Sequence, residues 1–98
     1  PKTKFICAHG PMNINFSLAL AKCENYFIDT CYTITLPGTF ELFVNKLGAH
    51  RILYGSDAPL SPHSTRLAQV LCDRINDEDM EKILGLNAAR LYRIPIPQ

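Results

Sequence analysis

The stretch Ile52-Leu53-Tyr54-Gly55-Ser56-Asp57-Ala58-Pro59 decides the fold, because an apolar run ends abruptly at small residues, a carboxylate and a proline. The run is typical of a buried parallel strand, and the two small residues after it leave little bulk beside Asp57. The proline lacks an amide donor and biases the residue before it toward an extended backbone. The sequence therefore predicts a buried strand that ends at an accessible carboxylate, which makes Asp57 the leading candidate for a functional residue.

Two further apolar runs precede this strand, and helical patterns separate the runs. Residues 5–8 form a first run that ends at His9-Gly10-Pro11, and residues 25–30 form a middle run. Between them, apolar residues recur at helical spacing at Phe16, Ala19, Leu20 and Cys23. A second helix is predicted with Thr39 as N-cap, an apolar face of Phe40, Phe43, Val44 and Leu47, and Gly48 at its end. Strands that alternate with helices predict an α/β fold with a parallel sheet.

The rest of the chain is predicted to be helical up to an extended tail. A helix capped by Ser64 is expected to bury Leu67, Ala68, Leu71 and Ile75. A helix capped by Asn76 is expected to begin with acidic residues, to bury Met80, Ile83 and Leu84, and to end at Gly85. Asn87 is expected to cap a last turn, in which Arg90 and Tyr92 pack and anchor the terminal helix.

Composition sets limits on location and partners. The 98 residues are 47% hydrophobic and carry a formal net charge of +1 without a basic cluster, so neither nucleic acid nor an anionic membrane is expected as a partner. No apolar stretch approaches the roughly 20 residues that span a bilayer, and no leader resembling a signal peptide opens the chain. We therefore expect the chain to form no more than one globular domain and to be located in the cytoplasm.

The four cysteines, Cys7, Cys23, Cys31 and Cys72, lie within apolar segments and lack the short paired spacing of a disulfide framework. Reduced, buried thiols are the favoured interpretation. A metal site built from Cys7 and His9 with Cys23 or Cys31 is the alternative, although the spacing matches no structural zinc pattern.

Three segments together resemble a known family: Lys4-Phe5-Ile6-Cys7-Ala8-His9-Gly10, Arg51 to Pro59, and Asn87-Ala88-Ala89-Arg90-Leu91-Tyr92. In this order they resemble the amidohydrolases, and more narrowly the metal-dependent hydrolases related to aminocarboxymuconate semialdehyde decarboxylase. The resemblance implies a partial (β/α)₈ TIM barrel. Residues 1–98 would form a single C-terminal segment, with about the last three β/α units, strands 6–8, and the C-terminal helices.

The resemblance also implies a chemistry. Asp57 matches the aspartate that closes the last barrel strand, which helps to hold a divalent metal and takes the proton of the attacking water. His9 matches the histidine that closes the sixth strand, so we expect a catalytic or substrate-facing role first and a ligand role second. The implied enzyme hydrolyses or non-oxidatively decarboxylates a small organic acid, lactone or amide. Zinc suits its mixed nitrogen and oxygen ligands, and manganese and iron stay open as alternatives.

Plainer interpretations of the same residues stay open. Asp57 could cap its own turn, and His9 could be a core histidine bonded to a neighbouring carbonyl. Asp29 is expected to be a polar strand-end or turn residue rather than a ligand. His50 is expected to be structural or exposed at the opposite end of the barrel, and His63 could touch substrate.

The resemblance leaves most of an active site unaccounted for. A complete barrel takes roughly 250 residues, and neither the His-x-His pair of the first strand nor the ligand of the fifth has a counterpart here. The chain begins at Pro1, so we expect a processed, excised or incomplete piece that is inactive alone. Its open edges predict pairing with a missing N-terminal barrel half or with another copy. The alternative function is a non-catalytic remnant or interaction module that keeps the packing motifs of the fold.

Overall fold

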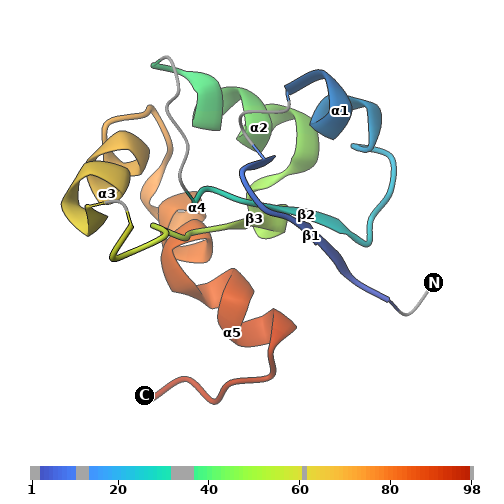
Figure 1. Ribbon diagram of the computed structural model, residues 1–98. Helices are drawn as coiled ribbons and strands as arrows, with labels where there is room; N and C mark the ends of the chain where they lie inside the picture. The colour runs from blue at the N-terminus through green and yellow to red at the C-terminus, as the bar shows by residue number, and fades with distance from the viewer. Residues whose placement is uncertain (1–2, 11–13, 32–36, 61, 98) are drawn as a thin grey trace.

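The computed structural model describes residues 3–10, 14–31, 37–60 and 62–97. Strands β1 (Phe5–Cys7), β2 (Tyr26–Asp29) and β3 (Ile52–Leu53) form a three-stranded parallel sheet in the order β1-β2-β3 (Figure 1). The register places Ile6 opposite Phe27 and Ile28 opposite Ile52. The predicted parallel α/β arrangement is therefore confirmed.

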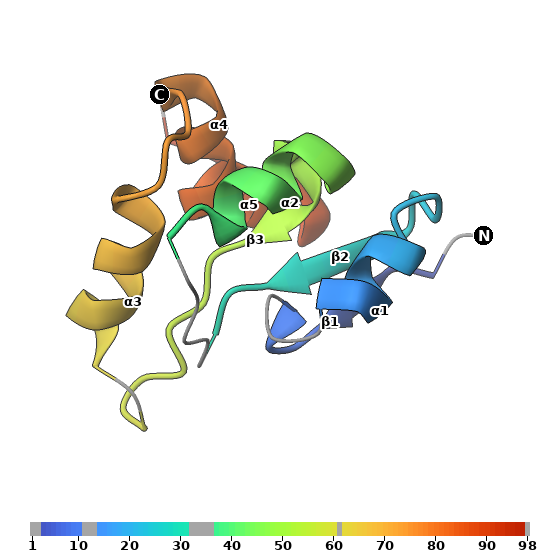
Figure 2. The ribbon, with the colours of Figure 1, turned by 90° about the horizontal axis from the view of Figure 1, so that it is seen from above.

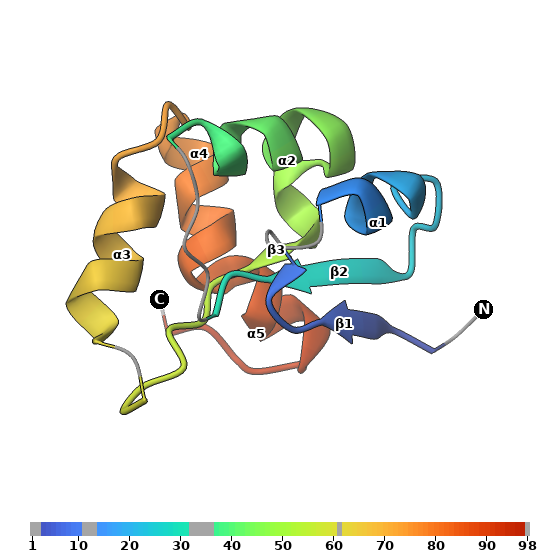
Figure 3. The same ribbon diagram turned by 45° about the horizontal axis from the view of Figure 1, so that its top comes forward.

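Helical elements follow each strand, and they account for most of the remaining described chain. They are α1 (Ile14–Ala19), α2 (Thr39–Leu47), the 3-10 turn η2 (Ala49–Arg51), α3 (His63–Leu71), α4 (Asp77–Glu81), the π-helix η3 (Lys82–Leu86) and α5 (Asn87–Leu91). Helices α1 and α2 lie on one side of the sheet, and α5 lies below β3 on the other side (Figure 3). Figure 2 shows α3 beyond the ends toward which the strands point.

The core lies between the sheet and α2. Ile28 and Ile52, neighbours in the register, are both fully buried. The core also holds Tyr26, Phe40, Phe43, Leu47, Ala49, Val70 and Ile83. The apolar face predicted for α2 is thus confirmed, with Val44 half-buried against the core. Gly48 also ends α2 as predicted, with φ at 94°, a conformation that favours glycine.

The predicted apolar face of the first helix is confirmed only in part. Leu20 is half-buried against the core, together with Leu18, but the helix ends at Ala19, Phe16 is 59% exposed, and Cys23 is exposed beyond the helix. The helix also makes a buried polar contact, because Ser17 donates from Oγ to the Gly10 carbonyl across 3.1 Å and lies 3.0 Å from the Tyr26 hydroxyl. A short helix with a polar contact point leaves its large apolar side chain outside.

The prediction of buried thiols is also wrong. All four cysteines are free, as expected, but Cys23 and Cys72 are exposed and Cys7 and Cys31 are only half-buried. Apolar neighbours in the sequence did not imply burial, because these segments lie at the rims of a small sheet.

Two helix starts differ from the predicted caps. Helix α2 begins at Thr39, and its start is capped by a distant carboxylate. Asp73 accepts hydrogen bonds from the backbone N–H groups of Gly38 (3.0 Å), Phe40 (2.9 Å) and Glu41 (3.3 Å). Helix α3 begins at His63 without a side-chain cap, so the cap predicted at Ser64 is wrong.

The buried face of α3 is also different from the prediction. Val70 is its buried side chain, whereas Ala68 is exposed and Leu71 is 51% exposed. Leu67 is half-buried, and Ile75, beyond the helix, is half-buried against the core as predicted, while most of α3 stands beyond the ends of the strands (Figure 2).

The C-terminal helix begins as predicted and ends later. Asn76 Oδ1 accepts from the Asp79 backbone N–H across 2.8 Å, so the predicted cap is confirmed. Gly85 does not end the helix, which continues through η3 into α5. Ile83 is buried, and its carbonyl accepts from the Tyr54 N–H across 3.0 Å. These contacts hold the helix against β3, which explains why the glycine is tolerated.

Asn87 is not a cap but a buried link between α5 and β3. Its Nδ2 group donates to the carbonyls of Ala49 (2.5 Å) and Ile52 (2.8 Å). Arg90 anchors the same helix by donating to the His50 carbonyl across 3.0 Å, as expected. Tyr92 is 60% exposed, so the packing predicted for it is wrong. No helix of the described residues is long and apolar enough to cross a membrane.

Candidate active site

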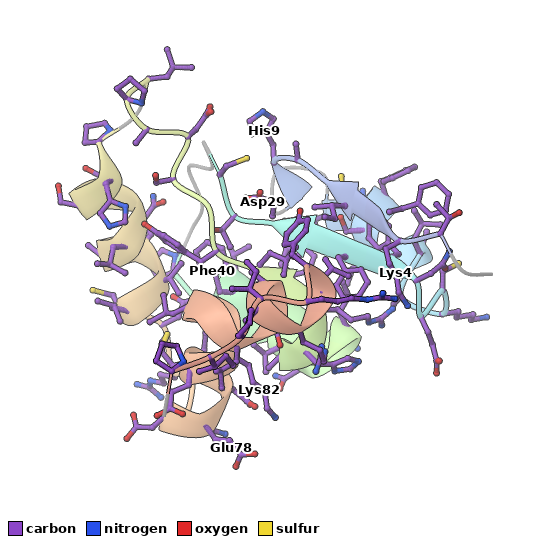
Figure 4. All side chains as sticks on the ribbon, turned by 90° about the horizontal axis from the view of Figure 1, so that it is seen from below. Lys4, His9, Asp29, Phe40, Glu78 and Lys82 are labelled. Carbon is purple, nitrogen blue, oxygen red and sulfur yellow. The ribbon has the colours of Figure 1, made fainter. Side chains whose placement is uncertain are left out.

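The residues predicted to be functional follow two strands of the same sheet. His9 comes just after β1 and Asp57 just after β3, while Asp29 ends β2 between them. The carboxyl ends of parallel strands share one edge of a sheet, and this edge is where α/β proteins place their ligands. Figure 4 shows His9 and Asp29 at this edge, with Lys4 at the opposite end of β1.

His9 is held by the segment that follows β2. Its Nδ1 lies 2.9 Å from the Cys31 carbonyl oxygen and 3.5 Å from the Cys31 thiol. A carbonyl oxygen can only accept, so Nδ1 carries the proton and the lone pair of the neutral imidazole is on Nε2. The carbonyl bond that the plainer interpretation expected is therefore present. It is also the bond that orients a histidine whose other nitrogen meets a metal or a substrate.

The ends of β2 and β3 are locked together by a pair of hydrogen bonds. The Thr30 hydroxyl donates to the Gly55 carbonyl and accepts from the Gly55 N–H, both across 3.0 Å. A Cβ atom at Gly55 would collide with the Asp29 carboxylate, so a side chain at this position would force that carboxylate to move. Asp29 itself accepts from the Cys31 N–H across 2.7 Å, which is the turn role predicted for it.

Asp57 is exposed, and its backbone has a positive φ of 62°. Within the part of the chain that the structure describes, no backbone N–H donates to its carboxylate. The turn uses Ser56 instead, whose Oγ accepts from the Ala58 N–H across 3.2 Å. The capping role considered for Asp57 is thus taken by its neighbour, and the Asp57 carboxylate faces solvent.

Cys31 joins the histidine to the two carboxylates. Burial raises the pKa of its thiol, a hydrogen bond from the His9 backbone acts in the opposite sense, and the charges of Asp29 and Asp57 raise it further. His9 and Asp29 contact Cys31, and Asp57 lies near enough for its charge to act on the Cys31 thiol; we call these four residues the strand-end cluster. Sequence reasoning missed the place of Cys31, although its position just after a strand end was a usable signal.

The remaining histidines lie outside this cluster. His63 begins α3, and its Nδ1 lies 3.0 Å from the Tyr54 hydroxyl, with the two rings edge to face at 5.6 Å. This contact fastens α3 to the strand that carries Asp57. His50 is exposed before β3, at the end of the sheet opposite to the cluster, as predicted.

The cluster does not make a complete metal site. No group of three or more His, Cys, Asp or Glu side chains that could hold a metal occurs within residues 3–10, 14–31, 37–60 and 62–97. A catalytic zinc ion usually takes about three protein ligands. The described residues therefore do not fit a catalytic metal by themselves.

Comparison with known proteins decides the family. A family model described as amidohydrolase matches residues 1–94, which is nearly the whole chain. The chain belongs to the amidohydrolase family. Comparison with curated proteins found no match.

Two solved decarboxylases and one solved amidohydrolase have the same fold over part of their length. The 5-carboxyvanillate decarboxylase from Sphingomonas paucimobilis is 18% identical, with a TM-score of 0.75 over 94% of this chain and 34% of that one. A dihydroxybenzoic acid decarboxylase from Polaromonas sp. JS666, with bound manganese and the inhibitor 2-nitroresorcinol, is 20% identical, with a TM-score of 0.74 over 93% and 34%. An amidohydrolase from Burkholderia multivorans with bound zinc is 16% identical, with a TM-score of 0.72 over 95% and 45%.

This amidohydrolase spans between a third and a half of the length of those structures. Such coverage agrees with the expected part of a TIM barrel. The numbering of its strands as the sixth to the eighth stays a prediction.

Proposed function

We propose that this amidohydrolase chain is part of a metal-dependent enzyme and contributes Asp57 and His9 to its active site. The observation that carries the proposal is the shared backbone conformation of the two residues. His9 has a φ of 57° beyond the end of β1, where it contacts Cys31, and Asp57 has a φ of 62° in the loop that follows β3. Left-handed residues other than glycine cost roughly 1 to 3 kcal/mol each, and they cluster at active sites and ligand clamps.

The two side chains have distinct proposed roles. The Asp57 carboxylate is exposed and receives no backbone hydrogen bond from the described residues, so it can accept a proton from a reacting water molecule. His9, with its proton fixed on Nδ1 by the Cys31 carbonyl, directs a lone pair from Nε2 and can accept a hydrogen bond from substrate. Neither role requires movement of the strands.

Asp57 is also the proposed metal ligand of this chain. The bound manganese of the Polaromonas structure and the bound zinc of the Burkholderia structure support a divalent cation, and zinc is the ion that the sequence favours. The other ligands would come from outside the described residues. As the proposed substrate we name a small organic acid, lactone or amide, with hydrolysis or decarboxylation as the reaction. The decarboxylases of 5-carboxyvanillate and dihydroxybenzoate support an organic acid.

The free edge of β1 is the proposed contact with the rest of the enzyme. Phe5 is 57% exposed, Ile6 37% and Phe16 59%, and these side chains line a groove of about 470 Å³ beside the strand. A strand edge flanked by exposed apolar side chains pairs readily with a further strand. We propose that the N-terminal part of a barrel occupies it. Sedimentation of the 98-residue chain tests the alternative of a second copy, which would give a dimer that Phe16→Lys dissociates.

The test of the proposed activity begins with the gene. The coding sequence upstream of Pro1 is read for a strand ending in His-x-His and a later strand ending in another ligand. If both are present, the full-length protein should contain a divalent metal. Its Asp57→Asn variant should then lose at least about 100-fold in kcat with an unchanged circular dichroism spectrum. Unchanged turnover would exclude Asp57 from the mechanism.

The second candidate is a non-catalytic module, and the lack of a three-ligand group among the described residues favours it for the isolated chain. We expect the 98-residue chain alone to neither retain zinc through dialysis nor turn over carboxylated phenols. An intact gene without the upstream ligands would establish this alternative for the whole protein.

A further inference from the structure

A second cavity lies at the end of the sheet opposite to the strand-end cluster. It has a volume of about 710 Å³ and is bordered by the residues that precede β1, β2 and β3 and by the end of α5. Four basic side chains line it, Lys4, His50, Arg90 and Arg93, against a single carboxylate, Glu24. Figure 4 shows Lys4 at this end of the sheet, far from His9. We call this space the basic cavity.

A buried cation adds to the positive charge next to this cavity. Arg51 is 5% exposed and follows His50 in the chain. Its guanidinium donates to three carbonyl oxygens, those of Leu47 (2.9 Å), Cys23 (2.7 Å) and Ala21 (2.6 Å). Within the described part of the chain no carboxylate pairs with Arg51. The guanidinium group is therefore hydrogen-bonded, but these carbonyl oxygens do not neutralise its charge, and its positive electrostatic potential extends to the surface.

This positive potential acts on the side chain of His50. Partial burial lowers the pKa of the otherwise exposed imidazole, the charges of Arg51, Arg90 and Lys82 lower it further, and Glu24 opposes them. Lys82 lies 3.5 Å from Glu78 and 3.6 Å from Asp79, so its charge is partly compensated. The excess positive charge that acts on His50 thus comes mainly from the arginines, and a bound anion would reverse its effect.

We propose that the basic cavity binds a small organic anion whose head group carries two negative charges, such as a phosphate or a pair of carboxylates. Guanidinium groups match the geometry of such oxygens, and Lys4 adds a mobile point charge. Phe27 and Leu91 supply an apolar wall for the organic part. The site lies at the other end of the sheet from Asp57 and His9, so it goes beyond the proposed function and does not depend on it.

Proton NMR of the His50 ring tests the proposal on the 98-residue chain, with His50→Gln to assign the signals. Titration with inorganic phosphate should raise the His50 pKa and should saturate. Sodium chloride at equal ionic strength should give a smaller and unsaturable change. Phenylphosphonate should bind more tightly than phosphate, because its ring can lie against Phe27. Succinate in a parallel titration distinguishes a dicarboxylate from a phosphate, and tighter binding of either than of chloride supports the site.

Variants separate a built site from general attraction. Lys4→Gln combined with Arg93→Gln should weaken phosphate binding at least tenfold, since both residues line the cavity. Lys46→Gln combined with Arg74→Gln removes an equal charge from two exposed positions outside the cavity lining and should leave binding unchanged. Equal weakening by both changes, or a phosphate effect no larger than that of chloride, would overturn the proposal. Asp57→Asn should leave binding intact, so failure of the proposed catalytic role and failure of this site are distinguishable.

Discussion

The Nδ1 atom of His9 lies 2.9 Å from the main-chain oxygen of Cys31, so the end of β1 is fastened to the segment that follows β2. The thiol of the same Cys31 responds to the charge of Asp57, which follows β3. One residue of the middle segment thus connects the ends of both outer strands. This arrangement makes Cys31 a reporter for the strand-end cluster.

The Asp57→Asn variant should lower the pKa of the Cys31 thiol, because it removes one of the negative charges that disfavour the thiolate. At a fixed pH between neutral and the wild-type pKa of Cys31, a larger fraction of Cys31 is then ionised. Alkylation by iodoacetamide at the Cys31 peptide, followed by mass spectrometry over a range of pH, should be faster than in the wild type.

Asp77→Asn is the matched control for this measurement, because Asp77 is an exposed carboxylate in the first turn of α4. It should leave the alkylation of Cys31 unchanged. If Asp57→Asn has no effect either, the carboxylate at position 57 does not face the cluster.

The left-handed backbone of Asp57 predicts a difference between two truncations of its side chain. With φ at 62°, alanine at this position retains the steric cost of a Cβ atom, whereas glycine does not. Asp57→Gly should be more stable than Asp57→Ala by roughly 1 kcal/mol in urea unfolding, although both remove the same carboxylate. Equal stabilities would mean that residue 57 leaves the left-handed conformation in solution.

Features of the fold that depend on neighbouring residues could be predicted from the sequence. Asn76 caps α4 through a bond to Asp79, and Gly48 ends α2 through its own backbone conformation. The parallel sheet followed from the alternation of apolar runs with helical patterns. The placement of polar residues at the strand ends followed from the sheet, since parallel strands end at a common edge.

Features that depend on residues distant in the chain could not be predicted. Asp73 caps α2 from beyond α3, and Asn87 binds the carbonyls around β3 from inside a helix. Nothing beside either residue indicates its partner. Cys31 likewise appeared to be a core thiol, because its contact with His9 exists only once β1 and β2 are paired. Of the four residues in the strand-end cluster, the sequence predicted only His9 and Asp57 to be functional.

Alanine substitutions at Gly55 and at Gly85 should have opposite effects on the stability of the fold. A Cβ atom at Gly55 would collide with the Asp29 carboxylate, so Gly55→Ala should force the ends of β2 and β3 apart and destabilise the fold by about 1 to 3 kcal/mol. At Gly85, in the π-helix, a Cβ atom meets nothing within 4 Å. Gly85→Ala should therefore stabilise the fold by about 0.5 to 1 kcal/mol, the usual gain from alanine in a helix. Urea unfolding measures both, and a neutral Gly55→Ala would contradict the close approach of Asp29.

The raised pKa of Tyr26 predicts that the fold loses stability at alkaline pH. Burial raises the pKa of its hydroxyl, a hydrogen bond with Cys7 raises it further and the bond with Ser17 opposes, which together raise the pKa from its ordinary value of 10.0 to about 12. The unfolded chain releases this proton at a lower pH than the folded chain does. The stabilising effect of neutral Tyr26 is thus complete below about pH 10 and is lost as the pH rises toward 12.

This loss should reach on the order of 2 kcal/mol, since one unit of pKa corresponds to about 1.4 kcal/mol and Tyr26 is buried. Urea unfolding of the wild type and of Tyr26→Phe between about pH 8 and 11.5 isolates the effect of this one hydroxyl. The phenylalanine variant should be less stable at pH 8, because buried Ser17 keeps its bond to the Gly10 carbonyl but loses the one with the Tyr26 hydroxyl, and it should show the shallower decline as the pH rises. Parallel declines in the two proteins would mean that the Tyr26 hydroxyl is as free to ionise in the folded chain as in the unfolded one. In that case Ser17 and Tyr26 would not form the buried polar contact that joins α1 to the sheet.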